Sequence, residues 1–135
     1  MTPREAFAAI ALVAVACDGS LDRQEAQALR EQLEGRHPYR QASEEEMGNL
    51  FDALLQRLRR EGWQSLLAQA IPVLNAPQQE TALAMAAQLV RSDRVLRPEE
   101  EELLNTMAEQ LMIPRDRCQQ ILDVIAILHR DSLAV

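Results

Sequence analysis

The sequence contains no lysine: all 14 basic residues among its 135 positions are arginines. Without lysine the chain can form no Schiff base, and it has no lysine of the kind that binds phosphate in a P-loop. Only two histidines are present, and no hydroxyl or thiol lies in a pattern that pairs it with a base. We therefore expect a protein without catalytic activity.

Cysteine, glycine and aromatic residues are also scarce. Cys17 and Cys118 form no CxxC or CxxH spacing, which excludes the common zinc and redox motifs. Each lies among apolar residues, so we expect small buried thiols, with a disulfide between them as the less favoured alternative in a chain that shows no sign of secretion. Aromatic residues make up only 3% of a chain that is 47% apolar, and glycine occurs four times. The core must be aliphatic, and the composition favours helices.

The charge of the chain is strongly negative. The formal net charge is −7 and the isoelectric point is about 4.8. Such a field repels phosphate backbones and anionic lipid headgroups. Nucleic acid is therefore excluded as an expected partner, whereas cations and basic protein surfaces are favoured.

One apolar run, Ala6–Cys17, needs a separate explanation because it resembles a lipoprotein signal. The preceding Arg4 and Glu5 cancel in charge, and the run is too short to span a bilayer. A similar apolar stretch, Ala82–Ser92, leads to an aspartate deep inside the chain, where no signal would stand. We therefore predict a core helix, no integral membrane segment and a cytoplasmic location.

Helical spacing of apolar residues and capping signals predict an all-α protein. We expect a single domain over residues 1–135, folded as a compact bundle of about seven helices. The predicted helices span residues 3–17, 23–34, 44–61, 63–74, 76–92, 98–111 and 114–129. In the last helix the predicted inner stripe comprises Cys118, Ile121, Leu122, Ile125 and Leu128.

Two short acidic motifs join helices in this scheme, at Ala16–Glu25 and at Arg91–Glu100. When the two are superposed, their acids and their leucine coincide. The matching pairs are Asp18 with Asp93, Leu21 with Leu96, and Glu25 with Glu100. This correspondence predicts two pseudo-repeated helical hairpins, at about 3–34 and 77–111, joined by the long helix at 44–61.

The residues of the first motif allow two chemical interpretations. Gly19 suits a turn with positive φ, and Asp22 with Glu25 forms the pattern of a helix N-terminal capping box. Asp18 follows a helix C-terminus, where a carboxylate is unfavourable unless the amides of the next helix or a bound cation take it. The first interpretation is capping; the second is a divalent-cation site, with Ser20 or a carbonyl as a further oxygen ligand.

The motif pair and the Gly62-Trp63 step resemble the TerB-like family of tellurite-resistance-associated proteins, over roughly residues 4–129. The resemblance implies a compact domain of about seven helices without established catalysis, whose acidic residues are suspected of binding a divalent metal. The matching positions are Asp18, Gly19, Glu25, Asp93 and Glu100. The negative field would repel a tellurite oxyanion, so the name of the family does not imply tellurite binding.

The second motif departs from the family pattern. Arg94 stands where the glycine is expected, and Arg97 stands where Asp22 supplies an acid. Two cations beside Asp93 would neutralise it, so a cation site is favoured at the first motif. The candidate metal ligands are Asp18, Asp22, Glu25, Asp93 and Glu100, and carboxylate ligands of this kind favour calcium or magnesium.

Two functions follow as hypotheses. The first is a non-enzymatic acidic helical domain, a protein-interaction scaffold related to stress or tellurite-resistance systems. The alternative is a domain that binds calcium or magnesium through Asp18, Asp22 and Glu25. The sequence leaves open whether the two acidic motifs converge, and convergence would strengthen the metal interpretation.

A last candidate is the loop Gly35–Ala42, where His37, Pro38 and Tyr39 lie between two arginines. One aromatic residue in a short loop is a weak signal for nucleotide stacking. We predict a packed connection with Tyr39 over the bundle and His37 exposed to solvent, and we assign it no site.

Overall fold

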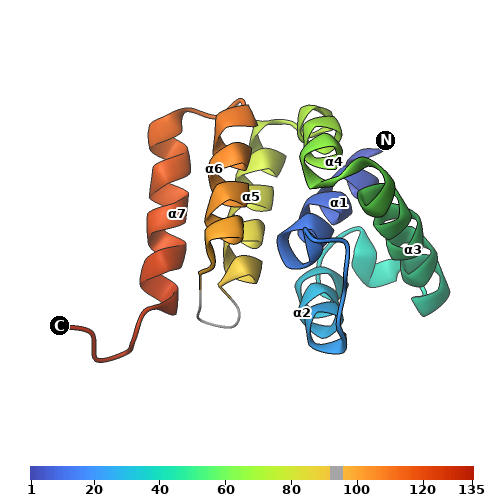
Figure 1. The fold of residues 1–135 in the computed structure, drawn as a ribbon, viewed down its shortest axis with the longest axis horizontal. Helices are drawn as coiled ribbons and strands as arrows, with labels where there is room; N and C mark the ends of the chain where they lie inside the picture. The colour runs from blue at the N-terminus through green and yellow to red at the C-terminus, as the bar shows by residue number, and fades with distance from the viewer. Residues whose placement is uncertain (92–95) are drawn as a thin grey trace.

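The computed structural model describes residues 1–91 and 96–135, and every regular element in these residues is helical (Figure 1). The α-helices are α1 (Pro3–Ala16), α2 (Arg23–Glu34), α3 (Glu44–Glu61), α4 (Trp63–Ala70), α5 (Ala76–Val90), α6 (Pro98–Gln110) and α7 (Arg115–His129). Two short 3₁₀ helices, η1 (Tyr39–Gln41) and η2 (Ile71–Val73), lie in the connections. The all-α class and the seven expected helices are confirmed for the described part of the chain.

Local signals set the ends of these helices. Thr2 and Glu5 form a capping box at the start of α1, and the Ser43 hydroxyl accepts from the Glu46 amide at 3.1 Å at the start of α3. Such caps satisfy amide groups that the first turn leaves without a partner. Pro72 limits α4, which ends at Ala70 and continues only as η2. Gly62, with φ of +84°, separates α3 from α4.

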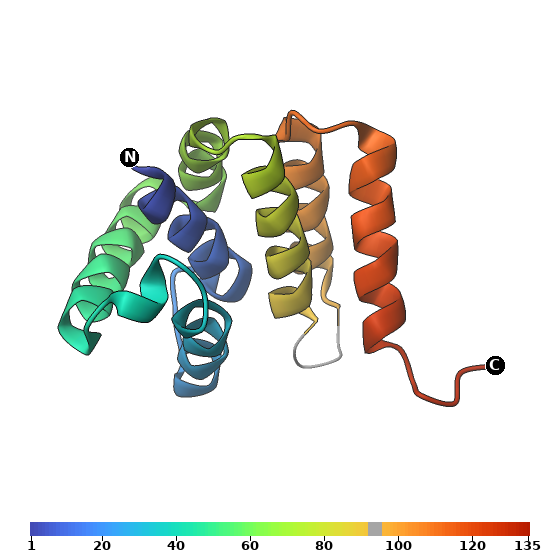
Figure 2. The ribbon, with the colours of Figure 1, turned by 180° about the vertical axis from the view of Figure 1, so that it is seen from behind.

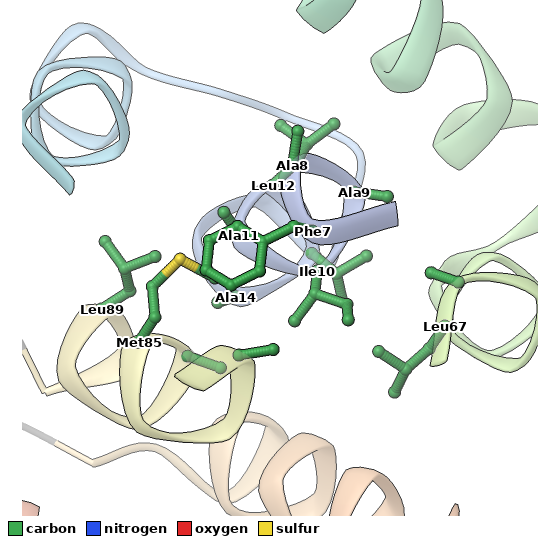
Figure 3. Packing of buried hydrophobic residues seen from close by; sticks show 14 of the residues in the cluster. Phe7, Ala8, Ala9, Ile10, Ala11, Leu12, Ala14, Leu67, Met85 and Leu89 are labelled. Atoms are coloured by element: carbon green, nitrogen blue, oxygen red, sulfur yellow. The ribbon is translucent and has the colours of Figure 1, made fainter. Parts of the chain in front are cut away.

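Helix α1 is the centre of the N-terminal part of the bundle. It packs against α2, α3, α4 and α5 (Figure 2). Its residues from Ala6 to Ala14 are all buried. Figure 3 shows Ile10 on the side that faces Leu67 of α4, and Met85 of α5 beside the other flank of α1. Alanine side chains along α1 allow these neighbours to approach closely. The predicted core helix is confirmed.

The apolar character of α1 thus serves the core of the bundle. Within residues 1–91 and 96–135, no helix combines the length and the hydropathy that crossing a bilayer demands. This finding agrees with the expected lack of an integral membrane segment.

The hairpins α1–α2 and α5–α6 each pack as a pair, and α1 also packs against α5. Helix α3 lies at the edge of the bundle beside α1 and α4 (Figure 1). Residues 92–95, between α5 and α6 in the sequence, lie outside the described part. The pseudo-repeat therefore stays a prediction.

Helix α7 covers α5 and α6 at the C-terminal edge of the bundle (Figure 1). Cys118 is its one buried residue, and Ile121, Leu122 and Ile125 are half-buried. Leu128 is 63% exposed, so its prediction as an inner residue is wrong. The reason is that α7 is an edge helix, and only its inner stripe meets the bundle.

Candidate functional site

The turn of the first motif is closed by its own residues. Gly19 has φ of +84° and its amide donates to the Ala16 carbonyl at 2.8 Å, as expected for a helix-ending glycine. The Asp18 carboxylate turns to Ser20: Oδ1 accepts from the Ser20 amide at 3.0 Å and from its hydroxyl at 2.9 Å. These bonds lower the pKa of Asp18. The hydrogen bonds from Ser20 therefore stabilise the negative charge of Asp18, and neither the amides of α2 nor a bound cation is needed for this.

The start of α2 is held by the predicted pair of acids. Asp22 Oδ1 accepts from the Glu25 amide at 2.7 Å, and Glu25 Oε1 accepts from the Asp22 amide at 3.0 Å. Glu25 is half-buried, and this burial raises its pKa, with a further contribution from the negative charges of Asp22 and Asp18. The capping interpretation of these two residues is confirmed.

The second motif is described from Leu96 onward, so the predicted ligand Asp93 lies outside the described residues. Glu100 Oε1 accepts from the Arg97 amide at 3.1 Å, and the Arg97 guanidinium lies 3.7 Å from the same oxygen. Glu100 therefore takes the place in the first turn of α6 that Glu25 takes in α2.

Described residues of the two motifs, Asp22 and Glu25 of the first and Arg97 and Glu100 of the second, line one cleft with a volume of about 410 Å³. Its polar wall comes from α2 with its cap and from the start of α6, and its apolar floor comes from α1, α2 and α5. The polar residues are Asp22, Gln24, Glu25, Gln27, Glu31, Arg97 and Glu100, and the apolar ones are Ala14, Val15, Ala28, Leu89 and Val90. The structure thus answers the question that the sequence left open: Glu25 and Glu100 line the same acidic cleft.

Cys17 lies close enough to both motifs to be affected by their charges. Its thiol is half-buried, and its pKa is raised first by burial and then by the charges of Asp18, Glu100 and Glu99. Acids of both motifs therefore act on one side chain. A raised pKa keeps the thiol neutral and poorly nucleophilic. Cys17 and Cys118 are both free thiols in the structure, as the favoured interpretation of the sequence expects.

The predicted metal ligands are only partly brought together. Glu25 and Glu100 share the cleft with Asp22, whereas Asp18 is engaged by Ser20. Within the part of the chain that the structure describes, no three Asp, Glu, His or Cys side chains gather closely enough to hold an ion. The described carboxylates do not by themselves provide the ligand set of a metal centre, and the cation site stays a prediction.

Sequence reasoning missed several residues of the cleft. Gln24, Gln27 and Glu31 line its wall at steps of three and four along α2, a spacing that places them on one helix face. This spacing could have identified the three residues as neighbours from the sequence. No sequence pattern could have identified Leu89 and Val90 as part of the cleft floor, because their position there depends on how α5 packs beside α1 and α2.

A substitution at Gly19 tests the turn that carries the first motif. In Gly19→Ala we expect the free energy of unfolding to fall by about 1–2 kcal/mol, because alanine is strained at positive φ. The new Cβ would also lie 3.3 Å from Arg59 Cγ, in the side chain whose Nε donates to the Gly19 carbonyl at 2.8 Å. Urea unfolding followed by circular dichroism measures the change.

The matched control is Gly35→Ala, at the end of α2. Gly35 has φ of −84°, and a Cβ there meets nothing within 4 Å. This variant is expected to be neutral or slightly more stable. Equal losses at Gly19 and Gly35 would contradict the assignment of strain to the first turn.

We compared the chain with protein families, curated proteins and solved structures. The family model described as Tellurite resistance protein TerB matches residues 4–123. Comparison with curated proteins and with solved structures gave no match. The family match covers most of the chain, including both acidic motifs and the helices that build the cleft. The chain therefore belongs to the TerB family.

Proposed function

We propose that this domain is a non-enzymatic protein-interaction module that binds a basic segment of a partner protein in the acidic cleft. The single observation that supports the proposal is the composition of the cleft, with carboxylates around an apolar floor. Through its family the module would belong to a stress or tellurite-resistance system. A cytoplasmic location is part of the proposal, and it rests on the interpretation of Ala6–Cys17 as a core helix and not a lipoprotein signal.

The apolar floor and the acidic wall of the cleft match the two parts of a lysine or arginine side chain. Such a side chain covers apolar surface with its methylene stem and keeps its cationic head among polar groups. Val15 and Leu89 supply apolar floor, while Glu25, Glu31 and Glu100 supply negative charge. The net charge of −7 adds long-range attraction for a basic partner.

The groups around the cleft also argue against catalysis. The carboxylates of Asp22 and Glu25 are engaged as helix caps, and the neighbouring Cys17 thiol has a raised pKa. No lysine exists anywhere in the chain to act as a base or a nucleophile. An interaction module needs none of these groups to react.

Calcium or magnesium binding is the second candidate function. The observation that favours it is that Glu25 and Glu100, at corresponding positions of the two motifs, line one cleft. Hard cations of this kind prefer several carboxylate oxygens. Binding would require the capping carboxylates to rearrange or further ligands to join them.

Neutralising the two shared glutamates tests the proposed function. We expect Glu25→Gln with Glu100→Gln to weaken the binding of a short, labelled leucine–lysine peptide by about tenfold, measured by fluorescence anisotropy. Glutamine keeps the acceptor that each capping box needs, so the fold is retained. Burial raises the pKa of Glu25, so this carboxylate is protonated at a higher pH than an ordinary glutamate. On acidification, peptide binding should therefore begin to weaken at a correspondingly higher pH.

The control for this variant is Glu101→Gln with Glu102→Gln, which makes the same change of charge on exposed positions of α6. Peptide binding should change little in the control. Equal weakening in both variants, or no binding by the unmodified protein, would reject the cleft as a peptide site. Calorimetric heat with calcium or magnesium that disappears in the Glu25 and Glu100 variant would instead favour the cation function.

A further inference from the structure

A second pocket lies at the opposite end of the α1–α5 pair from the acidic cleft, and it also has a volume of about 410 Å³. It is formed by the first turns of α1 and α5 and by the loop between α2 and α3. Its lining includes Arg4, Phe7, Arg36, His37, Tyr39 and Leu74. The loop that the sequence suggested was only a packed connection therefore forms one wall of a pocket, with Tyr39 buried and His37 exposed as expected.

The charge of this pocket is opposite to that of the protein as a whole. Arg4, Arg36 and His37 line it, and no acidic residue of the described chain does. Neither Arg4 nor Arg36 forms an ion pair within the described residues, although the chain has more acids than bases. Two half-buried arginines thus share one pocket without a carboxylate partner among the described residues.

Aromatic rings lie against both cations, and the Arg36 Nε also donates to the Gln32 carbonyl at 3.3 Å. The Arg4 guanidinium carbon lies 5.8 Å from the centroid of the Tyr39 ring, and that of Arg36 lies 5.4 Å from the centroid of the Phe7 ring. The two rings are themselves 6.3 Å apart, and the Tyr39 hydroxyl donates to the Arg4 carbonyl at 2.5 Å. Cation–π contacts of this kind restrict the arginines without neutralising them.

The surroundings further favour an anion. The N-terminal ends of α1 and α5 both lie at the pocket, through Arg4 and Gln78 in their first turns. Both ends are closed by capping boxes, and the Glu5 carboxylate in the cap of α1 is not part of the pocket lining. Burial raises the pKa of Tyr39 to about 12, so its phenol stays neutral and adds no negative charge. Phe7, Leu74 and three prolines supply the apolar part of the lining.

We propose that this pocket binds a small organic anion, a carboxylate or phosphate group carried on a flat apolar body. The anionic group would meet the guanidiniums of Arg4 and Arg36, because planar guanidinium pairs well with both kinds of anion. The body would lie against Phe7 and Leu74. A volume of about 410 Å³ is in the range of small-molecule sites.

The test uses phenylacetate and phenyl phosphate as probes, titrated into the full chain labelled with ¹⁵N. Amide resonances around Arg4, Arg36 and Gln78 should shift in a saturable way with at least one probe, and the preferred probe tells carboxylate from phosphate. Phenylacetamide, which keeps the body but has no charge, and acetate, which keeps the charge but has no ring, should each bind about tenfold more weakly or worse. No saturable shift with either probe, or equal shifts with phenylacetamide, would overturn the proposal.

Variants locate the site independently. Arg4→Gln with Arg36→Gln should weaken the preferred probe by about tenfold or more, whereas Arg30→Gln with Arg40→Gln, the same change of charge on exposed side chains nearby, should leave it within about twofold. Arg36→Gln alone gives the same direction of effect if the double variant does not fold. Binding by the double variant that equals that of the unmodified chain would overturn the proposal.

Discussion

Replacing Gln79 with leucine is expected to lower the free energy of unfolding by about 2–5 kcal/mol. Gln79 is a fully buried polar residue of α5, with no exposed surface. Its side-chain amide donates to the Ile71 carbonyl at 3.2 Å and to the Leu74 carbonyl at 3.0 Å, and its oxygen accepts from the Met112 amide at 2.8 Å. Leucine fills a similar volume but removes all three hydrogen bonds; the Ile71 carbonyl keeps the bond from the Leu74 amide at 3.1 Å, whereas the Leu74 carbonyl and the Met112 amide lose this partner. Leaving a buried polar group unsatisfied is costly.

The measurement for Gln79→Leu is urea unfolding with a matched control at Gln64. Gln64 is an exposed residue of α4, so Gln64→Leu should change stability by less than about 0.5 kcal/mol. The larger loss should be accompanied by faster amide exchange at Met112, because its hydrogen-bond acceptor is lost. A change at Gln79 no larger than that at Gln64 would mean that the connections after α4 and α6 do not depend on this side chain.

Gln79 also shows what local patterns leave undetermined. The sequence predicted the ends of the helices well because a cap such as Asp22 with Glu25 lies within one turn of chain. A glutamine inside an apolar helix looks like a surface residue unless its distant partners are known. Its acceptor oxygen serves Met112, which lies in the connection between α6 and α7, and only tertiary packing brings the two together.

The acidic cleft was only partly predictable, because local patterns show its acids but not the packing that brings them together. The acids Glu25 and Glu100 are visible in the sequence as members of two similar motifs, and the structure places both in one cleft. Their convergence depends on the packing of α1 against α5, which no local pattern encodes. The pocket at the other end was missed because its wall from Leu74 and Gln78 is distant in sequence from Tyr39.

Truncating Leu12 to alanine is expected to lower the free energy of unfolding by about 2–5 kcal/mol, the second large effect. Leu12 has no exposed surface and lies in the middle of α1, which four helices surround (Figure 3). A cavity in such a place cannot collapse easily, because relaxation would require several helices to shift together. Thermal and urea unfolding measure the loss.

The control is Leu128→Ala, which removes the same atoms from a residue of α7 that is 63% exposed. Little apolar burial is lost there, so the change should stay below about 0.5 kcal/mol. The contrast tests whether α1 or the edge helix α7 carries the stability of the bundle. Similar losses in the two variants would mean that the outer face of α7 is covered in solution, and a small loss in both would mean that the packing around α1 is looser than its burial indicates.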